Sequence, residues 1–222
     1  DEICYENSRV TMAASTPSFG ASNVATCVVS ELDTQVFADS AEVESYLATK
    51  RQAEYVSRFQ SRMDALYNEY IVENNCTGKG GTLIFGDSYM DFWNTWQSQT
   101  GLTQYVTGYN VGIGGSTVTD WLHAYDQLIK PFNADRFVVL VGGNDVNVWG
   151  DDGEVVVQRL KTLFEKLHVD HPNAEIYYIY TAPSPSAYSG GVYTPAKLGA
   201  LVEGSKALCE SLDYVQGIDM FD

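Results

Sequence analysis

The sequence predicts an α/β fold, in which a three-layer α/β/α sandwich surrounds a five-stranded parallel sheet. After Gly81, short apolar runs that are typical of buried strands alternate with longer segments of helical periodicity. Strands and helices that alternate with short joints form βα units, and such units build parallel sheets covered on both faces. The 222 residues are enough for this domain and an appendage, and 45% hydrophobic and 19% charged residues indicate a folded protein.

Residues 1–80 are predicted to form an N-terminal extension. Residues 1 to about 38 are rich in small polar residues and show no sustained periodicity. Farther along, apolar residues recur at helical spacing: Val56, Phe59, Met63, Leu66, Tyr67, Tyr70 and Ile71. We expect this long amphipathic helix to pack the extension onto the main domain, residues 81–222, which follows an Asn- and Gly-rich break at 74–81.

The main domain is predicted to contain five strands with helices between them. The strands are expected at 82–85, about 104–111, 136–141, 175–180 and 214–220. One helix should end before Pro131 and a second before Pro172, and a third should begin at Thr194-Pro195, where a capping residue precedes a first-turn proline. In the flavodoxin-like order 2-1-3-4-5, the first strand lies between the second and the third.

The acidic balance of the chain excludes several classes of partner. The sequence contains 29 acidic and 13 basic residues, which gives a formal charge of -16. A field of this sign repels phosphate backbones and anionic lipid, so we expect no nucleic-acid partner, whereas a neutral substrate is compatible with it. No apolar run approaches the roughly 20 residues that span a bilayer, so membrane insertion is not expected.

The four cysteines leave two interpretations open, because their spacing fits no zinc pattern. A reduced cytosolic set is one interpretation. The many Tyr, Ser, Thr, Asn and Gly residues favour the other, a secreted or cell-surface protein with two disulfides, which we predict as Cys76–Cys209 and Cys4–Cys27. Because the first residue is Asp1 rather than Met, a signal peptide could already have been removed.

Three of the predicted strands end in glycine-bearing segments. These are Gly86-Asp87-Ser88, Gly114-Gly115-Ser116-Thr117 and Gly142-Gly143-Asn144-Asp145. Ligands of open parallel sheets bind beyond the carboxyl ends of the strands, where the strand order reverses, so we expect Ser88 at the centre with the Gly115 and Asn144 loops beside it. Acyl transfer needs such a set, a hydroxyl nucleophile with hydrogen-bond donors aimed at the developing oxyanion.

Residues 82–222 resemble the SGNH, or GDSL-type, family of esterases and acetylhydrolases. The segment "IFGDSYM" is similar to the nucleophile motif of that family, "NVGIGGST" to its second motif and "VGGND" to its third. The resemblance implies Ser88 as the nucleophile, Gly115 as a backbone oxyanion donor and Asn144 as a side-chain donor. It implies no metal or organic cofactor, and the similar bacterial members often act on acetylated carbohydrates.

The general base of this family lies on an Asp-x-x-His motif after the fifth strand, and the sequence up to Asp222 does not contain that motif there. His123 follows Asp120 at this spacing, but within the helix after the second strand, where a helix-surface pair is the simpler interpretation. His168 and His171 flank a helix end expected at the opposite edge of the sheet. Three explanations stay open: the chain continues, a separate C-terminal fragment carries Asp-x-x-His, or catalysis is lost and the pocket is kept.

The sequence therefore predicts a serine esterase that removes a short acyl group, in the first instance acetyl, from a carbohydrate or similar neutral ester. Its main rival is a catalytically silent carbohydrate-binding or cell-surface module on the same fold. A nucleotide binder of flavodoxin type is a weaker alternative, because the glycines lack the spacing of a phosphate loop or a dinucleotide fingerprint.

Overall fold

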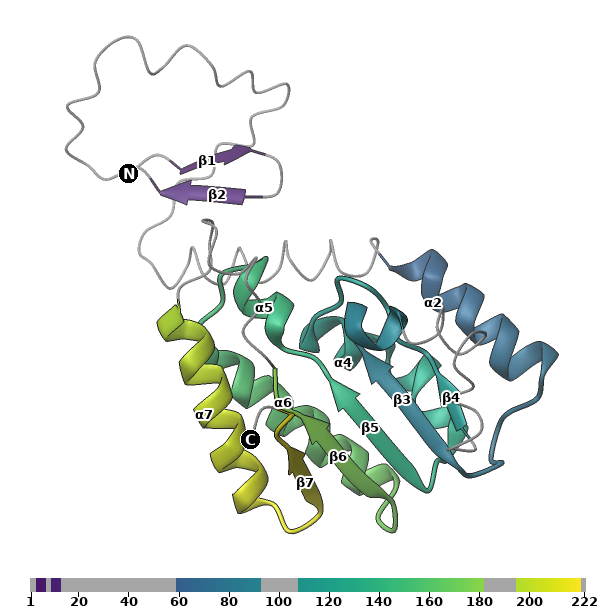
Figure 1. Ribbon diagram of the computed structural model, residues 1–222. Helices are drawn as coiled ribbons and strands as arrows, with labels where there is room; N and C mark the ends of the chain where they lie inside the picture. Colours follow the sequence, from purple (N-terminus) through teal and green to yellow (C-terminus); the bar gives the residue numbers. More distant parts are fainter. Residues whose placement is uncertain (1–2, 7–8, 13–58, 93–107, 182–194, 221–222) are drawn as a thin grey trace, which may run out of the picture. The chain divides into compact units, whose positions relative to one another are not determined.

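The computed structural model describes residues 3–6, 9–12, 59–92, 108–181 and 195–220 (Figure 1). The chain forms two compact units, residues 1–54 and residues 55–222. In the first unit, β1 (Ile3–Glu6) and β2 (Arg9–Met12) pair antiparallel. The predicted Cys4–Cys27 disulfide is not tested, because residue 27 lies outside the described residues.

The second unit is built on a five-stranded parallel sheet in the order β4-β3-β5-β6-β7 (Figure 1). Its strands are β3 (Thr82–Gly86), β4 (Gly108–Asn110), β5 (Arg136–Leu140), β6 (Glu175–Ile179) and β7 (Val215–Ile218). Thr82 pairs with Gly108 on one side and with Arg136 on the other. The first strand of this unit therefore lies between the second and the third, which confirms the predicted order.

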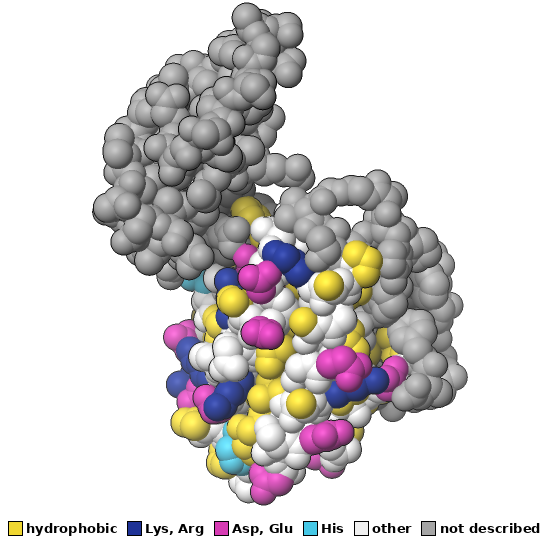
Figure 2. Space-filling view, turned by 90° about the vertical axis from the view of Figure 1, so that its left-hand side faces the viewer, with side chains coloured by type: hydrophobic (Ala, Val, Ile, Leu, Met, Phe, Trp, Pro, Cys, Tyr) yellow, Lys and Arg dark blue, Asp and Glu magenta, His cyan; other side chains and the backbone are white. Residues whose placement is uncertain are grey.

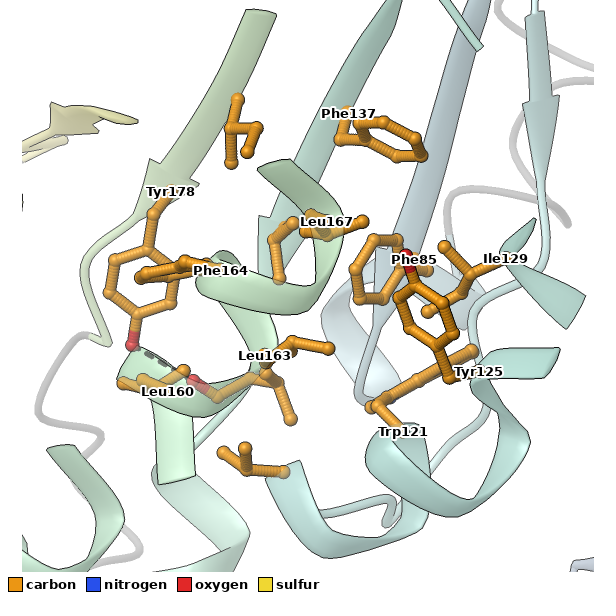
Figure 3. Close-up of a cluster of buried hydrophobic side chains, with 14 of the residues drawn as sticks. Phe85, Trp121, Tyr125, Ile129, Phe137, Leu160, Leu163, Phe164, Leu167 and Tyr178 are labelled. Carbon is orange, nitrogen blue, oxygen red and sulfur yellow. Dashed lines mark hydrogen bonds between the residues drawn. The ribbon is translucent and has the colours of Figure 1, made fainter. Parts of the chain in front are cut away.

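A layer of helices covers one face of this sheet within the described residues. It contains, in spatial order, α2 (Gln60–Tyr67), α4 (Val118–Leu128), α6 (Gly153–Asp170) and α7 (Pro195–Ser211). Figure 3 shows the core beneath them, where the Phe85 ring lies 5.0 Å from Trp121 and the Tyr178 ring lies 5.3 Å from Phe164. Burial of such aromatic side chains dominates the stability of a core.

The opposite face of the sheet carries a smaller apolar cluster. Successive side chains of a strand point to opposite faces, so Ile84 faces away from the cluster that contains Phe85. Ile84 packs with Leu140, Ile179 and Met90, and Met90 belongs to the helix that starts after β3. With apolar side chains buried on both of its faces, the sheet has the α/β architecture that the sequence predicts.

Helix α2 and its π-helical continuation η1 (Asn68–Glu73) belong to the unit of the sheet. Met63 and Leu66 of α2 are buried in the main core, and the Tyr70 ring lies 5.9 Å from that of Tyr109 on β4. The helical periodicity is therefore confirmed from residue 59 onward. The boundary between the two units lies at residues 54 and 55, whereas the sequence-based boundary lies at residues 80 and 81.

The predicted disulfide between Cys76 and Cys209 is wrong, since both are buried free thiols. Cys76 contacts Tyr109 on β4, at one edge of the sheet, and Cys209 contacts Tyr180, directly after β6 near the other edge. Three strand spacings, or roughly 14 Å, separate β4 from β6. A disulfide requires Cα atoms within about 7 Å of each other. The expectation that both cysteines lie at the same edge of the sheet was therefore not enough to predict a bond.

Two short helices complete the described part of the unit. They are η3 (Lys130–Phe132), which follows α4, and α5 (Gly143–Asn147), which follows β5. None of the helices in the described ranges combines the length and the apolar character needed to cross a bilayer. The polar residues of interest instead gather in the loops at the carboxyl ends of the strands.

Candidate active site

Strand β3 ends in a turn that requires glycine at position 86. Gly86 has a φ of +148°, and a Cβ atom there would overlap the carbonyl oxygen of Leu140 on β5. The Gly86 carbonyl accepts hydrogen bonds from the Ile113 N–H, at 3.0 Å, and from the Ser116 hydroxyl, at 3.1 Å. The Asp87 N–H donates to the Leu140 carbonyl at 3.0 Å. These bonds join the loops after β3, β4 and β5 at one edge of the sheet.

Ser88 begins the helix that follows this turn, and its side chain is half-buried. Asp87 caps that helix, because its Oδ1 accepts the Tyr89 N–H at 3.1 Å. Asp87 itself is only 3% exposed, and burial raises its pKa to about 6 against the opposing effect of the Tyr89 N–H. The buried cap therefore fixes the backbone on which Ser88 is presented.

The loop after β4 lies directly against this helix. Asn110 links the two, since its amide donates to the Met90 carbonyl at 2.8 Å and its Oδ1 accepts the Gly112 N–H at 2.9 Å. The Asp91 Oδ2 atom accepts the Gly114 N–H, also at 2.9 Å. These three bonds hold the loop close to the residues that surround Ser88.

Glycine allows the close approach between this loop and Ser88. A Cβ atom added to Gly114 would lie 3.8 Å from the Cβ atom of Ser88. Gly115, the next residue, has a φ of +80°, which only glycine adopts without strain. The Gly114 backbone therefore lies beside Ser88, and Gly115 follows it directly in the chain.

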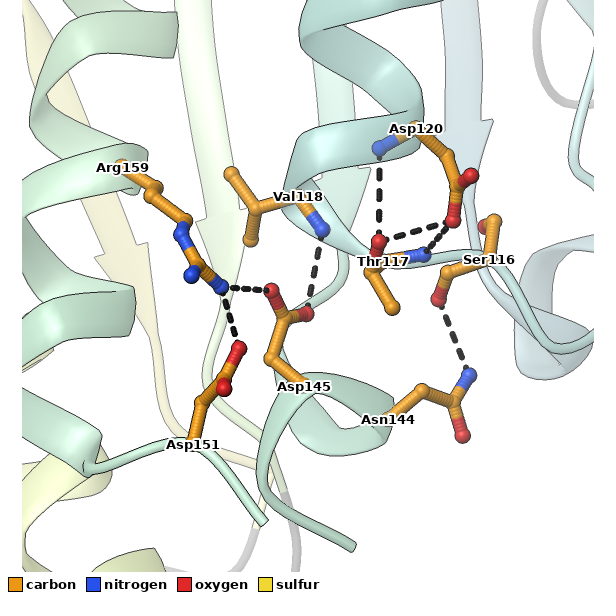
Figure 4. Close-up of polar contacts among 8 residues, drawn as sticks. All are labelled: Ser116, Thr117, Val118, Asp120, Asn144, Asp145, Asp151 and Arg159. Carbon is orange, nitrogen blue, oxygen red and sulfur yellow. Dashed lines mark hydrogen bonds and ion pairs between the residues drawn. The ribbon is translucent and has the colours of Figure 1, made fainter. Parts of the chain in front are cut away.

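Asn144 enters the same network from the loop after β5. It belongs to α5, which follows Gly142, a residue with a φ of +120°. The Asn144 Nδ2 atom donates a hydrogen bond to the Ser116 carbonyl at 3.0 Å (Figure 4). A carboxamide nitrogen carries two hydrogens, so it can donate a second bond to a reacting oxygen. Ser88, Gly115 and Asn144 thus lie on three loops that are bonded to one another.

A buried ionic network holds the segment that carries Asn144 (Figure 4). Asp145 is fully buried, and its two oxygens accept hydrogen bonds from the Val118 N–H, at 3.0 Å, and from Arg159, at 3.1 Å. Arg159 also forms an ion pair with Asp151 at 2.5 Å. Burial raises the pKa of Asp145, and the Val118 N–H and Arg159 oppose that rise. The network fastens α5 to the beginning of α4 and to α6.

Comparison with known protein families shows to which family this chain belongs. Residues 84–222 match the GDSL-like lipase/acylhydrolase family. The chain belongs to that family. No curated protein matches the sequence.

Solved structures of other GDSL-like and esterase proteins share the fold. A Streptococcus pneumoniae protein provisionally named a platelet activating factor has a TM-score of 0.59 at 20% identity, with 81% of each chain covered. A GDSL-like lipase from Bacteroides thetaiotaomicron has a TM-score of 0.54 at 15% identity, covering 69% of this chain and 77% of its own. Esterase EstA from Pseudoalteromonas sp., in a structure inhibited by monoethylphosphonate, has a TM-score of 0.51 at 18% identity, covering 63% and 76%.

The histidines of this GDSL-like protein all lie away from the Ser88 loop network. His123 is exposed on α4 in the sixth helical position, one and a half turns beyond the helix start. His168 stacks on Tyr214 at a ring distance of 3.9 Å, and His171 ends α6. These three are all the histidines of the sequence, so residues 1–222 place no histidine base beside Ser88.

The proposed surface pair of Asp120 with His123 is replaced by a capping box at the start of α4. The Asp120 Oδ2 atom accepts the Thr117 N–H at 2.7 Å, and Asp120 itself is buried (Figure 4). The sequence signal for this arrangement is Thr-x-x-Asp before an apolar run. The interpretation as a helix-surface pair overlooks this signal.

Two supporting side chains were not identified from the sequence. Asp91 lies one helical turn after Ser88, a spacing that could have indicated a neighbour of the nucleophile. Arg159 lies on a different helix from its partner Asp145, and no local pattern predicts that contact. Within the described ranges, no cluster of three or more His, Cys, Asp or Glu residues could hold a metal ion.

Proposed function

We propose that this GDSL-like protein is a serine esterase that removes a short acyl group, in the first instance acetyl, from a carbohydrate or a similar neutral ester. The observation that carries the proposal is the approach of the Gly114 backbone to the Ser88 side chain, within a network that also contains Asn144. A nucleophile next to loops that can present amide hydrogens is what acyl transfer requires.

The proposed reaction proceeds through an acyl-enzyme. The Ser88 Oγ atom attacks the ester carbonyl carbon, its proton passes to a base, and the carbonyl oxygen becomes an oxyanion. The Gly115 N–H and the second hydrogen of the Asn144 amide stabilise that oxyanion, and each such donor contributes about 3–4 kcal/mol. The tetrahedral intermediate collapses with loss of the alcohol, and water then hydrolyses the acyl-enzyme by the same steps.

The base is proposed to come from outside residues 1–222. A serine hydroxyl is a weak nucleophile without one, and the three histidines lie elsewhere in the fold. We propose an Asp-x-x-His segment, either on a continuation of the chain or on a separate C-terminal fragment that binds to it. Two aspartates lie near Ser88, and both accept other hydrogen bonds. Asp87 caps the helix by accepting the Tyr89 N–H, and Asp91 accepts the Gly114 N–H.

A neutral substrate is consistent with the charges of the described surface. Figure 2 shows basic side chains lying close to acidic ones on the face near α7, and Lys197–Asp152 and Lys206–Asp219 are ion pairs of the described residues. With an overall charge of -16, the protein repels anionic polymers. We also propose a secreted or cell-surface location, on the basis of composition. The Cys76–Cys209 disulfide no longer supports this proposal, because both thiols are free.

Labelling with a fluorophosphonate tests the proposed nucleophile. We expect the full-length protein to react at Ser88 and to hydrolyse an acetyl ester, and we expect Ser88→Ala to lose the label and at least about 10³-fold in kcat. Residues 1–222 alone should be far less active than the full-length protein. Equal turnover by the two would place the base within residues 1–222.

The rival function is a catalytically silent carbohydrate-binding or cell-surface module. The positions of the three histidines favour it, because residues 1–222 hold no histidine base beside Ser88. A full-length protein that binds a carbohydrate but takes no label at Ser88 would decide for this rival. Labelling with turnover would decide against it.

A further inference from the structure

Asp91 joins the two parts of the candidate site. It lies on the helix that begins with Ser88, and its Oδ2 atom accepts the Gly114 N–H at 2.9 Å. A Cβ atom added to Gly114 would lie 3.1 Å from this carboxylate oxygen and 3.8 Å from the Ser88 Cβ atom. One carboxylate thus lies between the helix of the nucleophile and the backbone that precedes the proposed oxyanion donor.

In the Gly112–Gly115 segment, the side chain of Ile113 packs in the core and its N–H donates to the Gly86 carbonyl at 3.0 Å. Gly112, Gly114 and Gly115 have no side chains with which to pack, and glycine is the residue with the most backbone freedom. Asn110 holds the beginning of the segment through the Gly112 N–H. Asp91 holds Gly114, the residue directly before Gly115. The Gly115 N–H belongs to the peptide unit that joins these two residues.

Helix α2 and its N-cap residue, Phe59, also contact this part of the site. Arg62 pairs with the Asp91 Oδ1 atom at 3.5 Å, and the Phe59 ring lies 3.8 Å from the position of a Cβ atom on Gly115. The Arg62 side chain is 44% exposed, and an exposed ion pair contributes little. The short hydrogen bond to Gly114 is therefore the stronger of the two contacts of Asp91.

We propose that Asp91 is a positioning residue, which fixes the Gly114–Gly115 backbone relative to Ser88 by accepting the Gly114 N–H. Its consequence for catalysis rests on the proposed function. A displacement of about 1 Å in such a site can cost about 100-fold in rate, so loss of the acceptor should reduce kcat. Because the acceptor rather than the charge is required, an asparagine with its Oδ1 in the same place should serve.

The kinetic test compares Asp91→Ala with Asp91→Asn in the full-length protein on an acetyl ester. We expect Asp91→Ala to lower kcat by about 10- to 100-fold with KM little changed, and Asp91→Asn to remain within about threefold of the wild type. Asp126→Ala is the matched control, because Asp126 is an exposed aspartate on α4 whose partner is Lys166. If Asp91→Asn were as inactive as Asp91→Ala, the charge would be required and the positioning role would be wrong.

Amide hydrogen exchange provides a readout that does not depend on esterase activity. The Gly114 amide should exchange slowly in the wild type and in Asp91→Asn, and at least about tenfold faster in Asp91→Ala, while the β3 and β5 amides are unchanged. Equal exchange at Gly114 in all three proteins would overturn the inference. Faster exchange in Asp91→Ala of a protein that hydrolyses no ester would support the positioning contact and reject the esterase.

Discussion

The two edges of the parallel sheet use the same kinds of residue in different ways. At the carboxyl edge, Asp87 and Asp145 are buried, and Asp145 bonds to groups on other elements of the chain. At the amino edge, Asp135 is exposed and accepts the Gly81 N–H at 2.7 Å, and Asp170 pairs with Lys130 near the surface. Polar bonds at both edges join residues that are far apart in the sequence. The buried bonds of the carboxyl edge are shielded from water and are therefore stronger, whereas water competes with the exposed bonds of the amino edge.

The amino edge also has a shallow pocket of about 190 Å³. It resembles a functional site only in the types of residue that line it. Asp135, Asp170 and His171 line it together with Asn133 and neighbouring residues. Burial lowers the pKa of His171, and its ring packs against Phe137 at 5.0 Å. Both ring nitrogens are buried, so they do not face the pocket. Comparison of the two edges shows that shared residue types alone do not indicate a functional site.

The largest expected difference between the edges concerns glycine. Gly86→Ala at the carboxyl edge would place a Cβ atom on the Leu140 carbonyl, so we expect a loss of about 4 kcal/mol or more in the free energy of unfolding. Gly78, before β3, also has a positive φ, of +68°, but no atom lies within 4 Å of an added Cβ. Gly78→Ala should therefore cost only about 1–2 kcal/mol. Urea unfolding measures both, and equal losses would contradict the distinction.

Removal of one carboxylate from each edge gives the next largest difference. Asp145→Ala leaves Arg159 without one partner and the Val118 N–H without an acceptor, and should cost about 3–5 kcal/mol in the free energy of unfolding. Asp135→Ala removes one exposed hydrogen bond and should cost about 1 kcal/mol. Chemical denaturation of both variants measures the difference. A larger loss for Asp135→Ala would reverse the assignment of the edges.

The smallest expected effect is a dependence of stability on pH. The pKa of Asp87 is about 6 in the folded protein, above its value of 3.8 in the unfolded chain, so protonation favours folding. This contribution is complete below pH 3.8 and is lost as the pH rises through 6, by about 2–3 kcal/mol. Asp87→Asn should flatten the stability profile in that range. An unchanged profile in Asp87→Asn would contradict the raised pKa of Asp87.

The sequence was sufficient to predict the sheet and the positions of the three motifs. Short apolar runs and helical patterns located the strands and helices, and glycines at the ends of β3, β4 and β5 indicated loops that approach one another closely. Gly86 and Gly115 illustrate the reason, since a positive φ or a crowded backbone leaves glycine as a visible requirement in the sequence. Their catalytic roles, with that of Asn144, stay predictions.

The contacts that support the site could not be predicted in the same way. Arg159 meets Asp145 because α6 returns along the sheet, and the partner of a buried charge depends on that tertiary packing. The predicted cysteine pairing was wrong for a related reason. Both cysteines were expected at the same edge of the sheet, but they lie near strands that are not neighbours, β4 and β6. The spacing of Thr117 and Asp120 is sufficient to predict a capping box, which the interpretation of Asp120 as the partner of His123 overlooks.

The association of α2 with the sheet has a consequence for how this protein could be recombined with others. The three motifs alone suggest a transferable module that starts at residue 81, yet Met63 and Leu66 fill the core beside α4. A chimera cut at that point would expose apolar surface and remove Arg62 from its carboxylate. A fusion or a graft should therefore keep α2 together with the sheet, as in the compact unit of residues 55–222.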